Sequence, residues 1–565
     1  MSTPTRAHLH RLTAKHPNRR LAHPPRLPIR DFPIRRCFAQ RTASRPAHIY
    51  ARRTVITSAI DPFTLAAAAT VSVGIAYFAT SHRGSDQAAD TGAKPTEEKA
   101  IAHQARLRED EEDDMAAQRL PGRPGNLSPD QEAKLKEMWA ATLEVFGVIH
   151  ERLSLETNGA STPASADDNT TSTEPKKKHR SRLSLGLGRK KDKAAGKEND
   201  PDANGNDKHG QNRDFQAALA SQTPAQLREA FWSMTKHDHP DALLLRFLRA
   251  RKWDVHAALV MLVSTMHWRS QEMHVDDDIM LRGEQYALRE SVAGNAAEKK
   301  EGADFMAQLR MGKSFLHGTD KDGRPCCYVR VRLHKQGEQS EKSLERFTVY
   351  TIETARMLLQ PPVDTATIVF DMTDFTMANM DYTPVKFMIK CFEANYPESL
   401  GSVLVYKSPW LFQGIWKIIK GWLDPVVASK VHFASNVEEL SQWIPRNGIS
   451  RELGGTEDYT YSYVEPREGE NAAFAGTVSR DKLLEERIQL VSSYETEVLA
   501  WIHGEGSGEG RGRLAQRLAE NYWRVDPFVR ARGLYDRTGV IGQGGRLDFY
   551  PGKVGVGRGG EDGVD

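Results

Sequence analysis

The stretch EANYPESLGSVLVY, residues 393–406, places a carboxylate, Glu398, between the end of an amphipathic helix and an apolar strand. A second charged residue, Lys430, ends the run DPVVASK and directly precedes another short apolar run. An ammonium group donates charge-assisted hydrogen bonds to a phosphate, and a carboxylate accepts hydrogen bonds from hydroxyl groups. Spacing alone leaves open whether Glu398 binds a polar ligand or is a solvated turn residue.

Patterns typical of enzymes and of metal sites fail when they are checked residue by residue. In GEGSGEG (504–510), Glu505 and Glu509 occupy the glycine positions that a nucleophile elbow requires. The run DKDG (320–323) begins like a calcium loop, but Arg324 stands where a ligand is needed. The four cysteines show neither a disulfide framework nor C-x-x-C spacing. No residue pattern therefore supports an enzyme, and we expect no catalytic residue and no metal site.

The first 118 residues divide by composition. Residues 1–60 hold thirteen Arg and Lys against one acid, as in a mitochondrial presequence. Residues 61–83 include an uncharged, mostly apolar stretch at the lower limit for a membrane anchor, with a buried or disordered apolar segment as the alternative. Residues 84–118 are expected to be an acidic disordered linker. Translation from Met1 would bring the protein to mitochondria or another membrane, whereas translation from Met115 would leave it cytoplasmic and peripherally membrane-associated.

The region 119–290 is predicted to be a helical lobe with a disordered insert at 155–213, which is rich in Ser, Thr, Asp, Asn and Lys. A basic cluster within the insert, residues 176–191, has three possible interpretations. It is a solvated run of charges, a contact for anionic lipid, or a nuclear localisation signal. The net charge of +3 gives no sign of a nucleic-acid partner. Near the C-terminus, residues 478–535 are predicted to form helices, and residues 536–565 are predicted to form a Gly-rich tail.

Strands alternate with helices from residue 327 onward, which indicates an α/β layer with a mostly parallel sheet. Thr383 and Pro384 are expected to begin one of these helices, and Ser435 with Glu438 to form a capping box on the last one. The expected strands are 327–333, 366–371, 402–406 and 431–434.

The segment PWLFQGIWKIIKGWLDP, residues 409–425, predicts an amphipathic helix. Gln413, Lys417 and Lys420 lie on its polar side. A core helix and a helix that meets a bilayer interface fit this pattern about equally. Its apolar side consists of Phe412, Ile415, Trp416, Ile419, Trp422 and Leu423.

Five motifs appear in order: LLLRFLRARKWDV, TDKDGRP, NYPESLG, LDPVVASKV and IPRNGISRELGG. Together they resemble the CRAL-TRIO lipid-binding family, and within it the fungal phosphatidylinositol transfer proteins. The resemblance covers roughly residues 119–154 and 214–465. It implies a CRAL-TRIO fold of the α/β class: a helical N-terminal lobe, a lipid-binding lobe at 305–465 with a mostly parallel sheet and a gating helix at 410–423, and a C-terminal helical extension.

The resemblance also implies a function. Arg251, Glu398 and Lys430 match the residues that bind the phosphoinositol headgroup in the family. The protein would bind phosphatidylinositol in an apolar cavity and transfer it between membranes or present it to lipid kinases, without catalysis and without a cofactor besides the lipid. The alternatives are a carrier of another hydrophobic ligand, such as a sterol, and a membrane-tethered scaffold.

Some family members also exchange phosphatidylcholine, which they hold with hydroxyl groups. Alignment on TDKDGRP and on the strand 366–371 puts four residues without a hydroxyl group at the matching positions, so we expect poor exchange of phosphatidylcholine. A shift of one residue in the strand would return Thr367 to such a position. The four residues are Leu316, Cys327, Ala366 and Ile368.

Overall fold

The computed structural model describes residues 120–149, 207–506 and 508–551. The expectations for residues 1–118, for most of the insert, for the end of the Gly-rich tail and for the choice between Met1 and Met115 lie outside these ranges. Within the described ranges, every helix is too short or too polar to span a bilayer.

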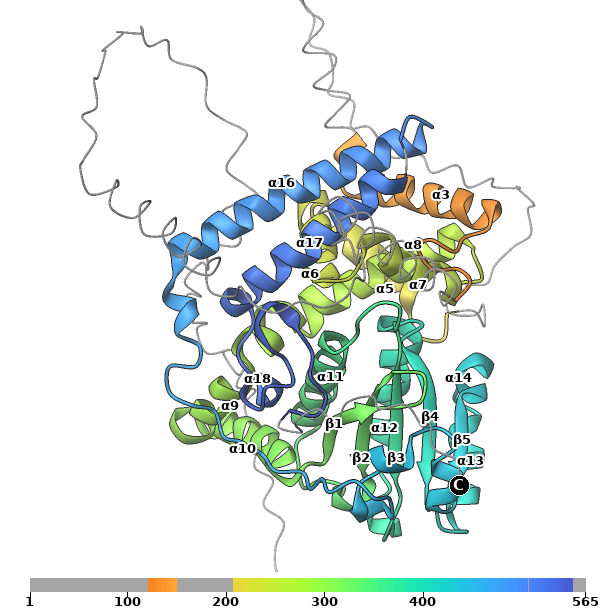
Figure 1. Cartoon of the computed structure of the whole chain (residues 1–565), viewed down its shortest axis with the longest axis vertical. Coiled ribbons are helices and arrows are strands. Elements are labelled where there is room, and N and C mark those ends of the chain that lie inside the picture. Colours follow the sequence, from red (N-terminus) through yellow and green to blue (C-terminus); the bar gives the residue numbers. More distant parts are fainter. Residues whose placement is uncertain (1–119, 150–206, 507, 552–565) are drawn as a thin grey trace, which may run out of the picture. The chain divides into compact units, whose positions relative to one another are not determined.

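The helices of the N-terminal lobe share one core with the two long C-terminal helices. Asp241 at the start of α7 joins them, because it accepts hydrogen bonds from Trp139 Nε1 and Tyr494 OH, both at 2.7 Å. In Figure 1, the C-terminal helices α16 and α17 run side by side next to this lobe. The C-terminal extension is therefore part of the lobe's core. The helices are α3 (Pro129–Val145), α5 (Gln211–Ser221), α6 (Pro224–Thr235), α7 (Pro240–Ala250), α8 (Val255–His267), α16 (Thr477–Ile502) and α17 (Gly508–Val529).

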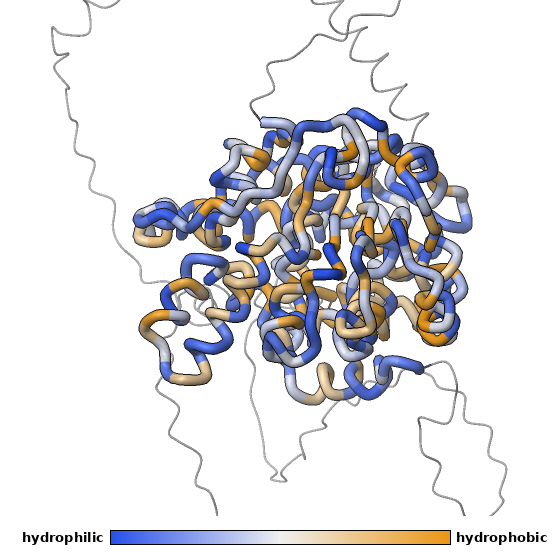
Figure 2. Tube along the Cα trace, turned by 90° about the horizontal axis from the view of Figure 1, so that it is seen from below, coloured by the Kyte–Doolittle hydropathy of each residue, from blue (hydrophilic) through white to orange (hydrophobic). Residues whose placement is uncertain are grey.

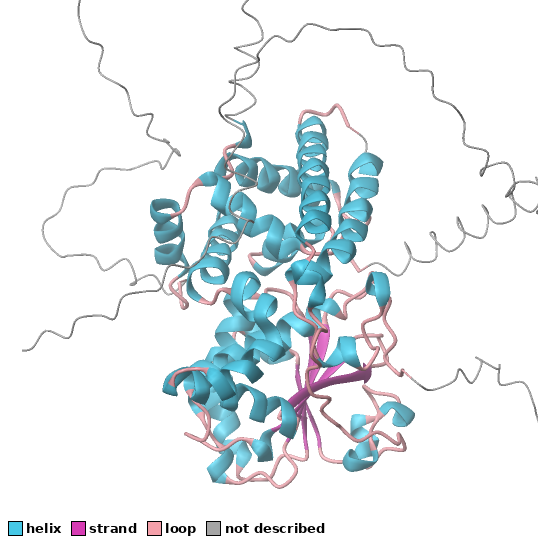
Figure 3. Ribbon diagram, turned by 90° about the vertical axis from the view of Figure 1, so that its left-hand side faces the viewer, coloured by secondary structure: helices cyan, strands magenta, loops and turns pink. Residues whose placement is uncertain are grey.

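The second lobe is built on a five-stranded sheet in the order β1-β2-β3-β4-β5. Figure 3 shows these strands in magenta with helices on both sides of them. The first pair is antiparallel and the others are parallel, so the expected mostly parallel sheet is confirmed. The strands are β1 (Ser314–Thr319), β2 (Pro325–Arg330), β3 (Ala366–Asp371), β4 (Leu400–Tyr406) and β5 (Val431–Ala434). The helices of this lobe are α9 (Leu281–Ala293), α10 (Ala296–Met311), α11 (Glu341–Met357), α12 (Tyr382–Lys390), α13 (Phe412–Lys420), α14 (Pro425–Ser429), α15 (Val437–Leu440) and α18 (Leu534–Arg537).

Several boundaries differ from the sequence-based expectation. Strand β2 ends at Arg330, and the residues after it form a 3₁₀ turn, although the alternating pattern continues to residue 333. Helix α5 begins at Gln211, inside the segment 155–213 assigned to the insert, because the Asp207 carboxylate accepts from the Gln211 and Asn212 amides.

Two helix caps were also assigned to the wrong residue. The N-cap of α12 is Asp381, whose carboxylate accepts from the backbone N–H of Thr383, so Thr383 lies within the helix. Helix α15 is capped by Asn436, which accepts from the Glu439 N–H at 2.9 Å, instead of by Ser435. A nearby Asp or Asn satisfies a free helix amide at least as well as Thr or Ser.

The two faces of the sheet are covered by different parts of the chain. Figure 2 shows hydrophobic and hydrophilic residues interspersed along the described chain. One face, with Tyr328, Val369 and Leu404, packs against residues from the segment 437–461. We call the other the ligand face. Its residues Leu316, Cys327, Ile368 and Val403 lie side by side in register across β1 to β4.

Candidate lipid-binding site

Glu398 lies on a clamped turn that leads into β4. Its φ of +53° is in the left-handed region, which is uncommon for a residue other than glycine and is held only where the surroundings fix it. Arg246 of α7 donates to the Glu398 carbonyl at 2.7 Å and to the Asp364 carbonyl at 2.6 Å. The Tyr396 hydroxyl donates to the buried Glu353 carboxylate at 2.8 Å. Contacts from two helices therefore fix the position of Glu398.

Lys430 faces Glu398 from the end of α14, directly before β5. Its Nζ lies 3.9 Å from Glu398 Oε2 and donates to the Leu400 carbonyl at 2.8 Å. The two side chains are 23% and 24% exposed. The structure thus brings together two of the three predicted headgroup residues, as a pair that a ligand can reach.

Arg251 has different neighbours. It donates to Gln211 Oε1 at 2.5 Å, and burial lowers its pKa while Asp424, Asp207 and Glu393 act in the opposite direction. No described contact joins it to the Glu398 and Lys430 side chains, so its role in headgroup binding stays a prediction.

Two arginines that the sequence analysis did not single out lie closer to Glu398. Arg246 and Arg249 stand three residues apart in LLLRFLRARK, and this spacing places them on one side of α7. Burial lowers the pKa of Arg249 to about 10, as do Arg123 and Arg246, whereas Asp364 and Glu398 raise it. The i, i+3 spacing was the signal that could have identified them.

Helix α13 packs against the ligand face. Phe412, Ile415 and Ile419 are buried against a cluster that includes Phe375 and Val405, and the Phe375 and Phe412 rings are 5.8 Å apart. The other predicted residues of this helix face, Trp416, Trp422 and Leu423, are partly buried on the same cluster. In this structure the apolar side of α13 packs on that cluster, and its role as a gate stays a prediction.

A group of charged residues holds the C-terminal end of this helix. The Glu393 carboxylate accepts from Lys208 Nζ at 2.6 Å, from His209 Nε2 at 2.9 Å and from the Asp424 N–H at 2.7 Å. Lys208 also donates to the Trp422 carbonyl. Burial alone would raise the pKa of Glu393, but His209, Lys208 and the Asp424 amide together lower it. We call Lys208, His209 and Glu393 the hinge cluster.

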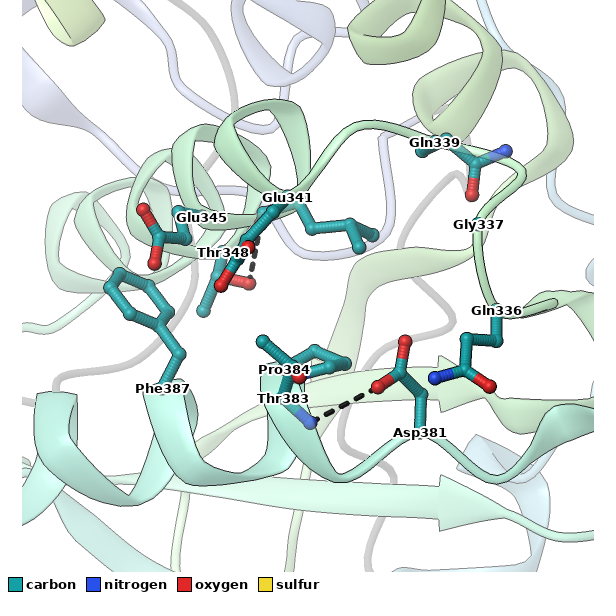
Figure 4. Close-up of a pocket in the computed structure, with 11 residues that line it drawn as sticks. Gln336, Gly337, Gln339, Glu341, Glu345, Thr348, Asp381, Thr383, Pro384 and Phe387 are labelled. Carbon is teal, nitrogen blue, oxygen red and sulfur yellow. Dashed lines mark hydrogen bonds between the residues drawn. The ribbon is translucent and has the colours of Figure 1, made fainter. Parts of the chain in front are cut away.

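Two cavities are lined by residues outside α13, and the smaller one borders the turn that carries Glu398. One, of about 160 Å³, is bounded by α11, α12 and the loop before α11 (Figure 4). Its lining includes Glu341, Glu345 and Asp381 as well as the apolar Leu344, Pro384 and Phe387. The other, of about 30 Å³, lies below the Tyr396 turn. Ligand pockets usually measure about 300–1,000 Å³, so neither of these two cavities is large enough for a diacyl lipid.

Comparison with known proteins places the chain in a family. The CRAL/TRIO domain matches residues 309–455, and the CRAL/TRIO N-terminal domain matches residues 211–264. A CRAL-TRIO domain-containing protein of Schizosaccharomyces pombe is 42% identical over 424 residues, which cover 74% of this chain and 92% of that protein. This chain belongs to the CRAL-TRIO family. The fold expected for a CRAL-TRIO protein, with a helical lobe and a mostly parallel sheet, is therefore confirmed.

Other CRAL-TRIO proteins match less of the chain. The phosphatidylinositol transfer protein CSR1 of Eremothecium gossypii is 40% identical over 324 residues, or 56% of this chain and 72% of that protein. The Sec14 cytosolic factor of S. pombe is 28% identical over 236 residues, or 38% of this chain and 74% of that protein.

Proposed function

We propose that this CRAL-TRIO protein binds phosphatidylinositol on the ligand face beneath α13, and that it transfers this lipid between membranes or presents it to lipid kinases. The observation that carries the proposal is the reachable pair of Glu398 and Lys430, held at the starts of β4 and β5 beside an apolar face that α13 covers. The name of the CSR1 relative supports the same ligand.

The chemistry of the pair fits an inositol phospholipid. Lys430 can exchange its bond to the Leu400 carbonyl for charge-assisted bonds to the lipid phosphate. Glu398 accepts from inositol hydroxyls and balances the lysine charge. Acyl chains cost about 0.8 kcal/mol per CH₂ in water, so α13 has to open for loading and close for transport.

A membrane surface is the partner that the outer side of α13 fits. Trp410, directly before the helix, is 88% exposed, and Ile418 on the helix is 48% exposed. Lys417 and Lys420 lie on the same helix. Tryptophan and lysine beside apolar residues suit the bilayer interface, so we propose peripheral membrane association, with no catalytic step, no cofactor besides the lipid and no nucleic-acid partner.

Mass spectrometry of the lipids that co-purify with the full-length chain tests this function. Phosphatidylinositol near one molecule per chain is the expected result. A sterol or another apolar compound in its place would overturn the ligand, and the absence of stoichiometric lipid would indicate a scaffold.

A further inference from the structure

A second segment covers the ligand face, at the end away from α13. Residues 534–549, which we call the cap segment, follow α17 and include α18. Ile541 of this segment is buried in the same apolar cluster as Leu316, Cys327 and Ile368. Tyr535, Leu547 and Phe549 pack against that cluster. One apolar surface of the sheet is therefore closed by α13 at one end and by the cap segment at the other.

Tyr535 also occupies the edge of the sheet. The Leu316 backbone N–H donates to the Tyr535 hydroxyl at 2.6 Å. Because β1 is an edge strand, this N–H would otherwise be open to another hydrogen-bond acceptor. The Tyr535 ring therefore fills the space beside Leu316, and its hydroxyl accepts the hydrogen bond that the Leu316 N–H donates.

Buried ion pairs hold the cap segment in place, unlike a mobile lid. Arg530, just before it, pairs with Asp526 and Asp536 at 2.7 and 2.8 Å, with its side chain 6% exposed. Arg537 pairs with the fully buried Glu284, whose carboxylate also accepts the Leu534 N–H at 3.0 Å. Opening the segment would separate buried opposite charges, which is strongly unfavourable.

We propose that the cap segment is a fixed end wall of the lipid cavity and that Tyr535 is a specificity-determining residue in it. The inference rests on the proposed function and names what the site excludes. Acyl chains can enter beneath α13 once this helix opens, whereas the fixed wall leaves no space beside Leu316 and Cys327 for a second polar headgroup such as that of phosphatidylcholine. The cap segment thus excludes the phosphatidylcholine headgroup sterically, and the strands also lack the hydroxyl groups that would bind it.

The first test measures vesicle-to-vesicle transfer of labelled phosphatidylinositol and phosphatidylcholine by the full chain. The double variant Tyr535→Ala/Phe549→Ala opens the wall. Changes in pocket size alter ligand discrimination by about 10- to 200-fold, so the ratio of phosphatidylcholine to phosphatidylinositol transfer should rise about tenfold or more. Tyr535→Phe should give a smaller rise, because the ring still fills the space.

Tyr550→Ala is the matched control. Tyr550 directly follows the cap segment, but its ring lies 5.7 Å from His317, which stacks on Tyr459 at 3.4 Å, away from the ligand-face cluster. This variant should keep the transfer ratio of the unchanged chain. An unchanged ratio in the double variant, with phosphatidylinositol transfer retained, would overturn the wall but leave the proposed function standing. Failure of the unchanged chain to transfer phosphatidylinositol would overturn both.

A second measurement needs no substitution, so it holds even if the double variant does not fold. Phosphatidylinositol with a photoreactive group at the end of one acyl chain is loaded onto the full chain and irradiated, and the labelled peptides are identified by mass spectrometry. Label within residues 534–549 is the expected result. Labelling confined to α13 and α12 would overturn the wall.

Discussion

Glu398 and Lys430 are the side chains on which the proposed function depends most directly. Removing either should lower phosphatidylinositol transfer, because hydrogen bonds to charged groups contribute about 1.5–3 kcal/mol, or roughly 10- to 100-fold in affinity. We expect Glu398→Ala and Lys430→Ala each to bring transfer close to background while circular dichroism stays unchanged. Both residues are partly exposed, so neither is needed for the core.

Glu137→Ala serves as the control, since Glu137 forms an exposed ion pair with Lys134 on α3. It should transfer lipid like the unchanged chain. Wild-type rates in both site variants would contradict the assigned roles.

Leu316, Cys327 and Ile368 carry the prediction about phosphatidylcholine. They are neighbours across β1, β2 and β3 on the ligand face, while Thr367 points to the other face and donates to Asp320 at 2.6 Å. The shifted register that would offer Thr367 to a ligand is thus disfavoured. Each missing hydrogen bond costs roughly 1–3 kcal/mol, so transfer of phosphatidylcholine should be at least about tenfold slower than that of phosphatidylinositol. Comparable rates in a side-by-side assay would refute this.

At the residue scale, the sequence predicted that Glu398 and Lys430 lie together, while their role in headgroup binding stays a prediction. Glu398 and Lys430 stand far apart in the chain, and only family motifs indicated that they meet. The i, i+3 spacing could have identified Arg246 and Arg249 as a pair on one side of α7. It does not show that Arg246 reaches the backbone carbonyls of distant residues, so this contact was not predicted. Arg251 belongs to the correct motif, but its described partner is Gln211.

The hinge cluster makes a prediction about the motion of α13. Glu393→Gln keeps the shape of the side chain but removes the charge that pairs with Lys208 and His209. Lys208 is 47% exposed, so the loss is screened and amounts to about 1 kcal/mol or less. Easier opening should then speed phosphatidylinositol exchange by roughly two- to fivefold.

Stopped-flow exchange of a fluorescent phosphatidylinositol measures this rate. Lys300→Gln, which breaks the ion pair of Lys300 with Asp304 on α10, is the control and should leave the rate unchanged. A slower or unchanged rate for Glu393→Gln would show that the cluster does not restrain the helix.

The presence of helices and strands with a strong periodic pattern was predicted better than the residues at which they begin and end. The amphipathic pattern of α13 and the apolar run at β3 were placed correctly, since both are local. Strand β1, SFLHGT, was missed because it contains a histidine and a glycine within its apolar pattern and pairs irregularly with β2. The caps of α12 and α15 shifted because two neighbouring residues at each end can accept the same kind of amide hydrogen bond.

For the whole molecule, His237 links acidity to stability. It lies on the connection between α6 and α7, with its ring 4.9 Å from that of Trp523 on α17. Burial lowers the pKa of His237 below its usual 6.5, with Asp238 opposing and Arg356 adding to the effect. The folded chain therefore binds fewer protons than the unfolded chain below about pH 6.5, and folding stability falls as the pH drops through this range.

Thermal unfolding at about pH 7.5 and about pH 5.5 measures this dependence. His237→Phe, which cannot be protonated, should show a smaller drop in Tm between the two pH values than the unchanged chain. His256→Phe, at an exposed position, should keep the full drop. An equal drop in all three would assign the acid sensitivity to other groups.

The hydrogen bond from the Leu316 N–H on the edge of β1 to the Tyr535 hydroxyl indicates where this domain ends. Family comparison marks the domain as closing at residue 455, yet the edge amide of Leu316 is satisfied by a residue far beyond that point. A fragment cut at the family boundary would carry an unshielded strand edge beside an uncovered apolar surface, the combination that favours intermolecular strand pairing. The smallest stable unit therefore extends through the cap segment, and a fragment that lacks it is expected to self-associate in solution.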